Sequence, residues 1–494
     1  MSEPQALDRA TALARRTPDT LIILLLLALL CAAATWFVPA GRFTEVIPAT
    51  DGGKQVRVVL HSYERVETSS PIGLFESGGG LGLLNLPFEG LVAGDKFGTS
   101  VGLVAFLLVL GGSFNLILRT GAIDRLILGF VVRYQSRAWL LIPGLFLLFS
   151  LGGAIFGMGE ETIPMILLLV PILARLGFNA IVVVLVSYVA TQIGFATSWM
   201  NPFSVVVAQG VAGLEPLSGA PFRVAMWGIF TLIGGALTLR YALGPGRLPT
   251  TDMPAATHVG TLPTEAPPVT ADWSDVGVGL ALLLGIGWVV WGVTTKGYYL
   301  PELAAQFLAI GLVAATLGMV RSRERMHAND CADAFREGAA IMLPIVLVVA
   351  LAKGLVLLLG GTDPTQPSVM NTLLYGLAGL VEGWPPLLSA WLMLLVQSVI
   401  NFFVTSGSGQ AALTMPILAP LGDLVGVSRQ VTVLAFQLGD GLTNLIVPTS
   451  AILMGVLGAA RIDWWDWARF FARWMAGMLG LASLFVVVAV LMGY

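Results

Sequence analysis

Residues 156–164 read FGMGEETIP, and they place two adjacent carboxylates, Glu160 and Glu161, inside a long apolar region. An acidic side chain near the centre of a bilayer costs about 2.5–3.5 kcal/mol on insertion scales, so such residues are functional candidates by default. The two side chains cannot point the same way on one helical turn. One glutamate is therefore expected to face a cavity and the other to cap the next helix, which begins near Pro164. The sequence leaves open which glutamate has which role, and the alternative is that both only cap the helix and form hydrogen bonds.

The composition places the whole chain in a membrane. Of 494 residues, 56% are hydrophobic and 11% are charged, and the mean hydropathy is +0.86. An ordinary soluble domain has about 25% charged residues. The net charge is −3, and no basic patch is interleaved with aromatic residues, so a nucleic-acid partner is not expected. The partners predicted are the lipid bilayer and a small solute.

The apolar runs and the arginines between them predict the topology. Four arginines (119, 125, 133 and 137) precede the run at 139–156, and Arg175 follows the run at 163–176. Positive charges in short loops favour the cytoplasmic side, so both outer ends of this pair belong there and the pair forms a re-entrant hairpin. The N-terminus is then cytoplasmic. The full set of runs is 21–38, 101–118, 139–156, 163–176, 179–213, 222–243, 274–295, 302–320, 339–360, 386–404, 411–426, 429–459 and 467–492.

An internal repeat divides the chain into two halves. GMGEETIPM at 157–165 matches GSGQAALTM at 407–415, and QIGFATSWMNPFS at 192–204 resembles QLGDGLTNLIVPTS at 437–450. The predicted topology gives the copies opposite orientations, as in many secondary transporters. We expect an all-α integral membrane protein with two inverted repeats, each with a re-entrant hairpin and a broken transmembrane helix. Residues 1–243 form the first repeat with an outer loop at 40–99, 244–300 a linker and connecting helix, and 301–494 the second repeat.

Glycine and proline mark the expected helix breaks. Gly194 and Pro202 bracket the first, and Gly439, Gly441 and Pro448 bracket the second. A proline removes a backbone donor and clashes with the preceding turn, so polar side chains become available beside freed carbonyls. The alternative is that small residues only allow close helix packing. The candidate side chains are Thr197, Ser198 and Asn201 in the first break, and Asp440, Thr443, Asn444, Thr449 and Ser450 in the second.

The hairpin tips, at 157–162 and 405–410, supply the remaining candidates. Helix N-termini attract anions such as a substrate carboxylate, although Ser and Thr there also serve as plain N-caps. The candidates are Thr162 in the first tip, and Thr405, Ser406, Ser408 and Gln410 in the second.

The charges in these motifs are all acidic, because Glu160, Glu161 and Asp440 have no Lys or Arg beside them. This favours a cationic guest: a coupling sodium ion, a proton, or the ammonium group of an amino acid. A sodium ion is expected near Gly159, Asn201, Gly409 and Asn444. Lys353, in the apolar run VVALAKGLVL, is expected to extend its ammonium group outward to the membrane surface.

Several motifs together resemble the YfcC-type members of the anaerobic C4-dicarboxylate carrier family, in the ion transporter superfamily. They are GMGEETIPM, TSGSGQAALTMPILAPLGD, QLGDGLTNLIVPTSA and GGSFNLILRTGAIDRLI. The resemblance implies an inner-membrane, multi-pass secondary transporter that forms homodimers and works as an elevator. In that mechanism the hairpins and broken helices move against a scaffold made of 21–38, 101–118, 302–320 and 339–360. Dicarboxylate carriers related to this family have Ser-Asn-Thr at the tips, and this chain does not.

The cargo therefore remains open at this point between a C4-dicarboxylate and an amino acid, including arginine–ornithine exchange. No catalytic residues are expected. The three histidines, His61, His258 and His327, lie in predicted loops, so an intramembrane serine or zinc hydrolase lacks its required histidine. A channel built on the same hairpins is a further alternative, which concentrative uptake would exclude.

Overall fold

The computed structural model describes residues 20–48, 56–66, 71–78, 80–94, 96, 100–159, 161–247, 272–320, 326–361, 363–380 and 383–494. Within these residues, eight helices are long and apolar enough to cross a membrane. They are α4 (Val101–Arg119), α6 (Ala138–Phe156), α11 (Ala220–Leu243), α12 (Trp273–Lys296), α13 (Leu300–Val320), α14 (Ala328–Leu358), α16 (Pro386–Phe403) and α20 (Trp464–Leu491). The chain is a multi-pass helical membrane protein.

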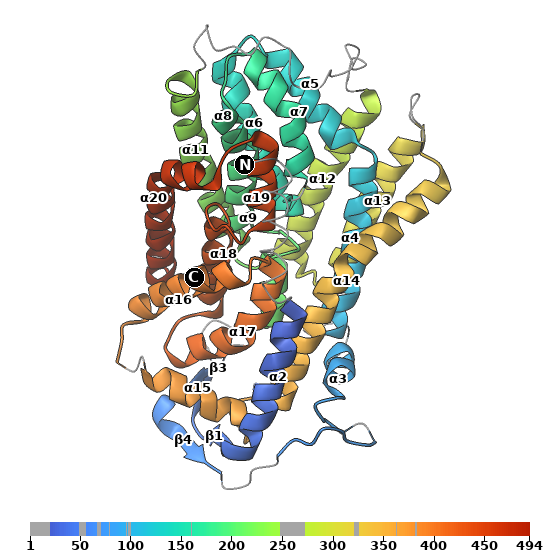
Figure 1. Ribbon diagram of the computed structural model, residues 1–494. Helices are drawn as coiled ribbons and strands as arrows, with labels where there is room; N and C mark the ends of the chain where they lie inside the picture. Colours follow the sequence, from blue (N-terminus) through green and yellow to red (C-terminus); the bar gives the residue numbers. More distant parts are fainter. Residues whose placement is uncertain are drawn as a thin grey trace.

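Two helical hairpins occupy the positions expected from the repeat. In the first, α6 ends at Gly157, whose φ of 67° is in the left-handed region, and α7 (Thr162–Arg175) returns. In the second, α16 is followed by α17 (Gly407–Leu424), whose N-cap is Ser406. Figure 1 shows α6 and α7 in the upper half of the molecule and α16 and α17 in the lower half. Glu160 lies outside the described residues.

Both interrupted helices are present, but each interruption begins later than the glycines suggested. The first helix consists of α8 (Ala180–Val184), the π-helical turn η2 (Leu185–Val189) and α9 (Ala190–Ala196), and it resumes as α10 (Val205–Val211). The second consists of α18 (Arg429–Thr443) and resumes as α19 (Ala451–Ala460). Gly194, Gly439 and Gly441 lie inside α9 and α18, where they allow neighbouring helices to approach closely. The prediction that these glycines mark the breaks is wrong.

The interrupted helices form the centre of the molecule. Every residue in 182–202 and in 431–445 is buried. Unpaired backbone groups at membrane depth are tolerated where protein encloses them, so this burial explains how two breaks can exist in a bilayer.

Helix packing in the two halves follows matched pairs. The helix α6 packs on α9 as α16 packs on α18, while α7 packs on α19 as α17 packs on α10. Around this centre, α11 packs on α6 and α20 packs on α16. A second group consists of α13 on α4, α2 (Thr20–Phe37) on α14, and α4 on α14. These pairs of contacts in one half therefore have counterparts in the other.

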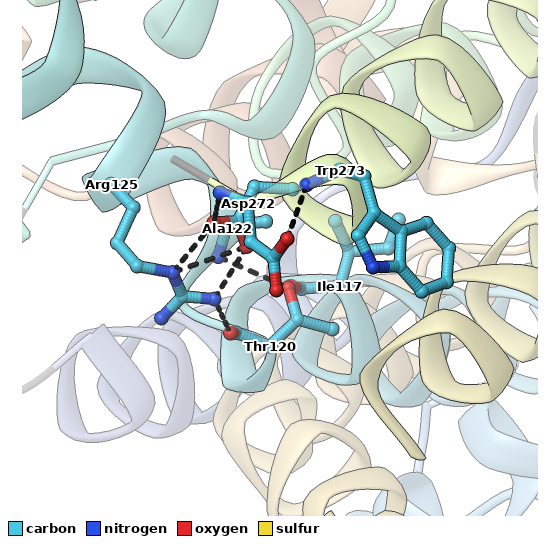
Figure 2. A network of polar contacts seen from close by, with 7 residues as sticks. Ile117, Thr120, Ala122, Arg125, Asp272 and Trp273 are labelled. Carbon is cyan, nitrogen blue, oxygen red and sulfur yellow. Dashed lines mark hydrogen bonds and ion pairs between the residues drawn. The ribbon is translucent and has the colours of Figure 1, made fainter. Parts of the chain in front are cut away.

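Two short helices connect the second group to the hairpins. The first, α5 (Ala122–Tyr134), joins α4 to α6, and the second, α15 (Val369–Leu380), joins α14 to α16. A bidentate ion pair fixes the beginning of α5: Arg125 Nε and Nη2 lie 3.0 Å and 2.7 Å from the carboxylate oxygens of Asp275 in the first turn of α12. Figure 2 shows Arg125 beside Thr120 and Asp272 at this junction. The Asp275 side chain is only 2% exposed, so this charge-assisted pair holds the beginning of α5 against α12.

Short strands add a small cap to the helical body, where the sequence predicted an outer loop. Strand β1 (Gly41–Phe43) pairs antiparallel with β4 (Tyr63–Arg65), and β2 (Val46–Pro48) pairs antiparallel with β3 (Val56–Val58). The turn η1 (Leu60–Ser62) and the helix α3 (Leu86–Val92) complete the segment. Gly41 exchanges backbone hydrogen bonds with Ser368, just before α15, which attaches the cap to the second connecting helix.

Candidate substrate and ion site

The two helix breaks lie against each other at the centre of the protein. A Cβ atom built on Gly441 of α18 would lie 2.5 Å from Cα of Ala196, the last residue of α9. Beside this crossing, Gln437 Nε2 donates a hydrogen bond of 2.6 Å to the carbonyl of Ser198. Polar residues from the two halves of the sequence, 239 positions apart, thus belong to one site.

The candidate side chains of the first break, Thr197, Ser198 and Asn201, are occupied by structural hydrogen bonds. Ser198 Oγ donates to Ala154 O at 2.5 Å, and Asn201 Nδ2 donates to Gly153 O at 3.3 Å, so both satisfy carbonyls near the end of α6. Asn201 Oδ1 accepts from Phe203 N at 2.8 Å. Thr197 Oγ1 donates to Ile193 O within its own helix. These residues join the first hairpin to the first break, as capping groups do.

In the second break, the same joining role falls to Asn401 of α16. Its Nδ2 lies 3.0 Å from Asp440 O, 3.0 Å from Thr443 Oγ1 and 3.1 Å from Asn444 Oδ1. Tyr188, in the π-helical turn η2, donates from its hydroxyl to Asn444 O at 2.8 Å. Side chains from two other elements, Asn401 and Tyr188, therefore satisfy polar groups at the end of α18.

Asp440 differs from the other candidates because it is a fully buried acidic group and half of its carboxylate has no partner among the described residues. The side chain is fully buried, and Oδ1 accepts one long hydrogen bond of 3.4 Å from Asn444 Nδ2. Oδ2 has no hydrogen-bond partner among the described residues. A Cβ atom on Gly407 would lie 2.8 Å from Oδ2, so this oxygen points at the first residue of α17. A buried carboxylate is costly unless it is paired, so Asp440 is suited to bind a cation or an ammonium group.

The tip of the second hairpin lies directly beside Asp440. Ser406 Oγ caps α17 by accepting from Gly409 N at 3.3 Å, and it lies 3.4 Å from Ser408 Oγ. Gln410 Nε2 donates to Gln397 Oε1 at 2.6 Å, while its own Oε1 is buried without a partner. Thr405 is half-buried and precedes the cap. The tip is therefore compatible with both a capping role and a binding role: Ser406 caps the helix, and Gln410 Oε1 remains without a partner nearby.

The other candidates lie at the edges of the site. Glu161 is exposed, and its Oε2 accepts from Gly159 N at 3.0 Å, which closes the first tip on itself. Thr162 is buried and donates to Gly159 O at 2.5 Å. Ser450 caps α19 by accepting from Leu453 N, and Thr449 Oγ1 is buried without a partner.

The four residues predicted to surround sodium lie in the tips and breaks of both halves. Their amide groups are largely engaged: Gly159 N by Glu161, Gly409 N by Ser406, and Asn444 by Asn401 and Asp440. In the described part of the chain, no three His, Cys, Asp or Glu side chains form a metal-binding group. The sodium site stays a prediction, and Asp440 is the residue best suited to contribute to it.

A buried basic residue, Arg223, lies next to the site and was not among the residues predicted from the sequence. Arg223 of α11 is fully buried; its Nε donates to Gln437 Oε1 at 3.3 Å, and Nη1 donates to the Tyr494 hydroxyl at 2.5 Å. Nη2 has no partner among the described residues. The hairpin and break motifs contain no basic residue, but the fold places Arg223 in hydrogen-bond contact with Gln437, the first residue of the second break motif. Asn401, Gln437 and Tyr188 were also missed, although each is a polar residue in an otherwise apolar run, which is the signal that could have identified them.

Comparison with known proteins agrees with this architecture. Residues 17–491 match the family described as C4-dicarboxylate anaerobic carrier, DcuC. The chain is 46% identical to the Escherichia coli protein named "Putative basic amino acid antiporter YfcC", over 97% of each chain. The YdaH transporter of Alcanivorax borkumensis has a similar structure, with a TM-score of 0.71 and 17% identity over 97% of this chain and 99% of that one. MtrF of Neisseria gonorrhoeae, from a class of antimetabolite efflux pumps, gives a TM-score of 0.68 and 13% identity over 98% and 97%.

The two solved structures establish the transporter fold, and the family match covers nearly the whole chain. The helices, the central breaks and the enclosed polar site are what a secondary transporter requires, and the family is one of carriers and not of enzymes. The chain is therefore a secondary transporter that belongs to the C4-dicarboxylate anaerobic carrier family.

Proposed function

We propose that this transporter exchanges amino acids, and basic amino acids in particular, across the membrane. The observation that carries the proposal is Asp440, a fully buried carboxylate with one unpartnered oxygen at the crossing of the two breaks. An ammonium or guanidinium group would satisfy that oxygen, whereas a second carboxylate would be repelled by it. The name of the 46% identical relative supports the same class of cargo.

The charge arrangement also favours an amino acid over a dicarboxylate. Among the described residues of the central helices, the fold buries the carboxylate of Asp440 in α18 and the guanidinium of Arg223 in α11. An amino acid carries charges of both signs, while a C4-dicarboxylate carries two of one sign. The departure of both tips from the Ser-Asn-Thr pattern of the related dicarboxylate carriers points in the same direction. A coupled Na⁺ or H⁺ at Asp440 is the remaining way to satisfy its charge.

Exchange in proteoliposomes tests the cargo. Vesicles preloaded with unlabelled arginine are expected to accumulate labelled arginine, ornithine or lysine at least about tenfold faster than unloaded vesicles, because an exchanger returns only when it is occupied. The same vesicles are assayed with succinate and fumarate, at two pH values, and with and without sodium. Exchange of succinate without exchange of any amino acid would contradict the proposal, and restore the dicarboxylate as the cargo.

We further propose an elevator mechanism built on two inverted repeats, with residues 244–300 linking them. The matched packing pairs support the repeats, as do the two hairpins on opposite halves of Figure 1. The hairpins and broken helices form the moving unit, while α2, α4, α13 and α14 form the scaffold. The connecting helices α5 and α15 each join the scaffold to one hairpin, and the Arg125–Asp275 pair fixes the scaffold end of α5. The scaffold is expected to form a homodimer.

Orientation and movement can be tested together with single cysteines. In right-side-out cells, an impermeant thiol reagent should label a cysteine near Arg429 but not cysteines near Arg137 or Arg175, because the N-terminus and the open end of the first hairpin are proposed to be cytoplasmic. Labelling of positions 137 and 175 from opposite sides would exclude the hairpin.

Disulfide crosslinks between α14 and α17 should stop transport, because they join the proposed scaffold to the proposed moving unit. Undiminished transport with such crosslinks completely formed would contradict the elevator.

A further inference from the structure

A cavity lies between the proposed scaffold and the proposed moving unit, away from the helix breaks. Its volume is about 90 Å³, and α14 lines one side while α17, the end of α10 and the beginning of α18 line the other. A buried water needs roughly 10–15 Å³ measured in this way, so the cavity can hold a small organic group and several waters. Its lining includes two basic residues, Lys353 and Arg429.

The two basic residues differ in whether their charge is neutralised. Arg429 Nη2 lies 2.7 Å from Asp423 Oδ2, and its Nη1 donates to Ala212 O at 2.8 Å, so this guanidinium is paired. Lys353 is half-buried and has no ion-pair partner among the described residues. It lines the cavity together with Val349, Ala352 and Val356 of the same helix. The apolar run around Lys353 predicted that its ammonium group extends to the membrane surface, whereas in the structure Lys353 lines this cavity.

An ammonium group inside a membrane span must face water or an anion. Lys353 lines the cavity, whose facing wall is mainly apolar and includes Met415, Pro416, Ala419 and Pro420 of α17. The cavity therefore contains one unneutralised cation with a paired guanidinium beside it, and it lies between the proposed scaffold and the proposed moving unit.

We propose that Lys353 binds the carboxylate group of the solute in this cavity, before or after the solute occupies the central site. The inference rests on the proposed function, since it assigns the carboxylate of an amino-acid cargo to Lys353 in the cavity and its cationic end to Asp440 in the central site. A Lys353–carboxylate contact selects cargo that carries a carboxylate over amines of the same length that lack one.

The test measures charge selectivity inside the cavity without depending on transport. Val356→Cys places a thiol on the same face of α14, in a background where Cys31 and Cys331 are replaced by serine. In purified protein at low ionic strength, a sulfonate methanethiosulfonate reagent should react about tenfold faster than the ammonium reagent of the same size, because Lys353 concentrates anions there. Lys353→Met should remove this preference and Lys353→Arg should keep it. Lys296→Met, at the exposed end of α12, is the matched control and should leave it unchanged.

Protection then identifies the anion. Acetate and arginine should slow the sulfonate reaction several-fold, whereas sodium chloride at equal ionic strength and agmatine, which has no carboxylate, should not. Equal rates for the two reagents, a preference that survives Lys353→Met, or equal protection by chloride would overturn the proposed site. Amino-acid exchange by wild-type vesicles is measured separately, so its absence would contradict the proposed function without bearing on the charge preference of the cavity.

Discussion

Asp440→Asn is expected to lower amino-acid exchange by about tenfold to a hundredfold while leaving the protein folded. A hydrogen bond to a charged group contributes about 1.5–3 kcal/mol, and this substitution removes the charge that would hold the ammonium group or coupling ion. Asp440 is fully buried and its Oδ2 has no partner in the described structure. Neutralising an unpaired buried charge does not weaken the fold, so the melting temperature should equal or exceed that of the wild type. Exchange rates in proteoliposomes and thermal melting of the same preparations measure both quantities.

Glu161→Gln is the matched control, because it neutralises the described carboxylate of the first tip. Glu161 is exposed and accepts one hydrogen bond from Gly159 N, so a glutamine retains the acceptor and most exchange activity. Glu160→Gln is measured alongside, because the role of that residue is still a prediction. If all three variants keep wild-type exchange and its dependence on pH and sodium, the acidic residues are structural and the charge argument for the cargo fails.

Gly194→Ala is expected to have the largest effect on folding. A Cβ atom at this position would lie 1.9 Å from the carbonyl oxygen of Ser150 and 2.9 Å from the backbone nitrogen of Ala154 in α6. Both are backbone atoms, so no side chain can rotate away and the two helices must separate. Overpacking of a core costs typically about 1–3 kcal/mol, and a clash with backbone belongs at the upper end of that range. The yield of monodisperse protein and its melting temperature should both fall.

Gly153 is the partner position and predicts the same outcome, since a Cβ there would lie 1.9 Å from Thr191 O. The controls are Gly228→Ala in α11 and Gly480→Ala in α20, where an added Cβ meets nothing within 4 Å. These should melt at or above the wild-type temperature, because alanine is the better helix former. A Gly194→Ala protein that melts like the controls would show that α6 and α9 are not in contact as described.

Local composition and repetition were enough to determine the class of protein, the helical hairpins and the approximate position of each break. Long apolar runs have only helical solutions in a bilayer, so hydropathy alone predicts the spans. The repeat identified the two tips because GMGEETIPM and GSGQAALTM preserve their glycines across the two halves. The same motifs identified Asp440 as a candidate, since an acidic residue in an apolar run is costly wherever the helix lies.

Only the tertiary structure decided which polar residues are already satisfied and which are free. Ser198 and Asn201, like Asp440, are polar residues in an apolar run. In the structure they form hydrogen bonds with carbonyls at the end of α6, and those contacts depend on how two helices cross. Gly194 was predicted to mark a helix break but lies inside α9, where it allows α6 to pack closely. The sequence alone does not distinguish these two roles of a glycine. Arg223 and Lys353 lie outside the motifs and reach the central site and the cavity through helix packing between segments far apart in the chain. Periodicity and spacing describe each helix separately, whereas partners, burial and charge balance arise from contacts between helices.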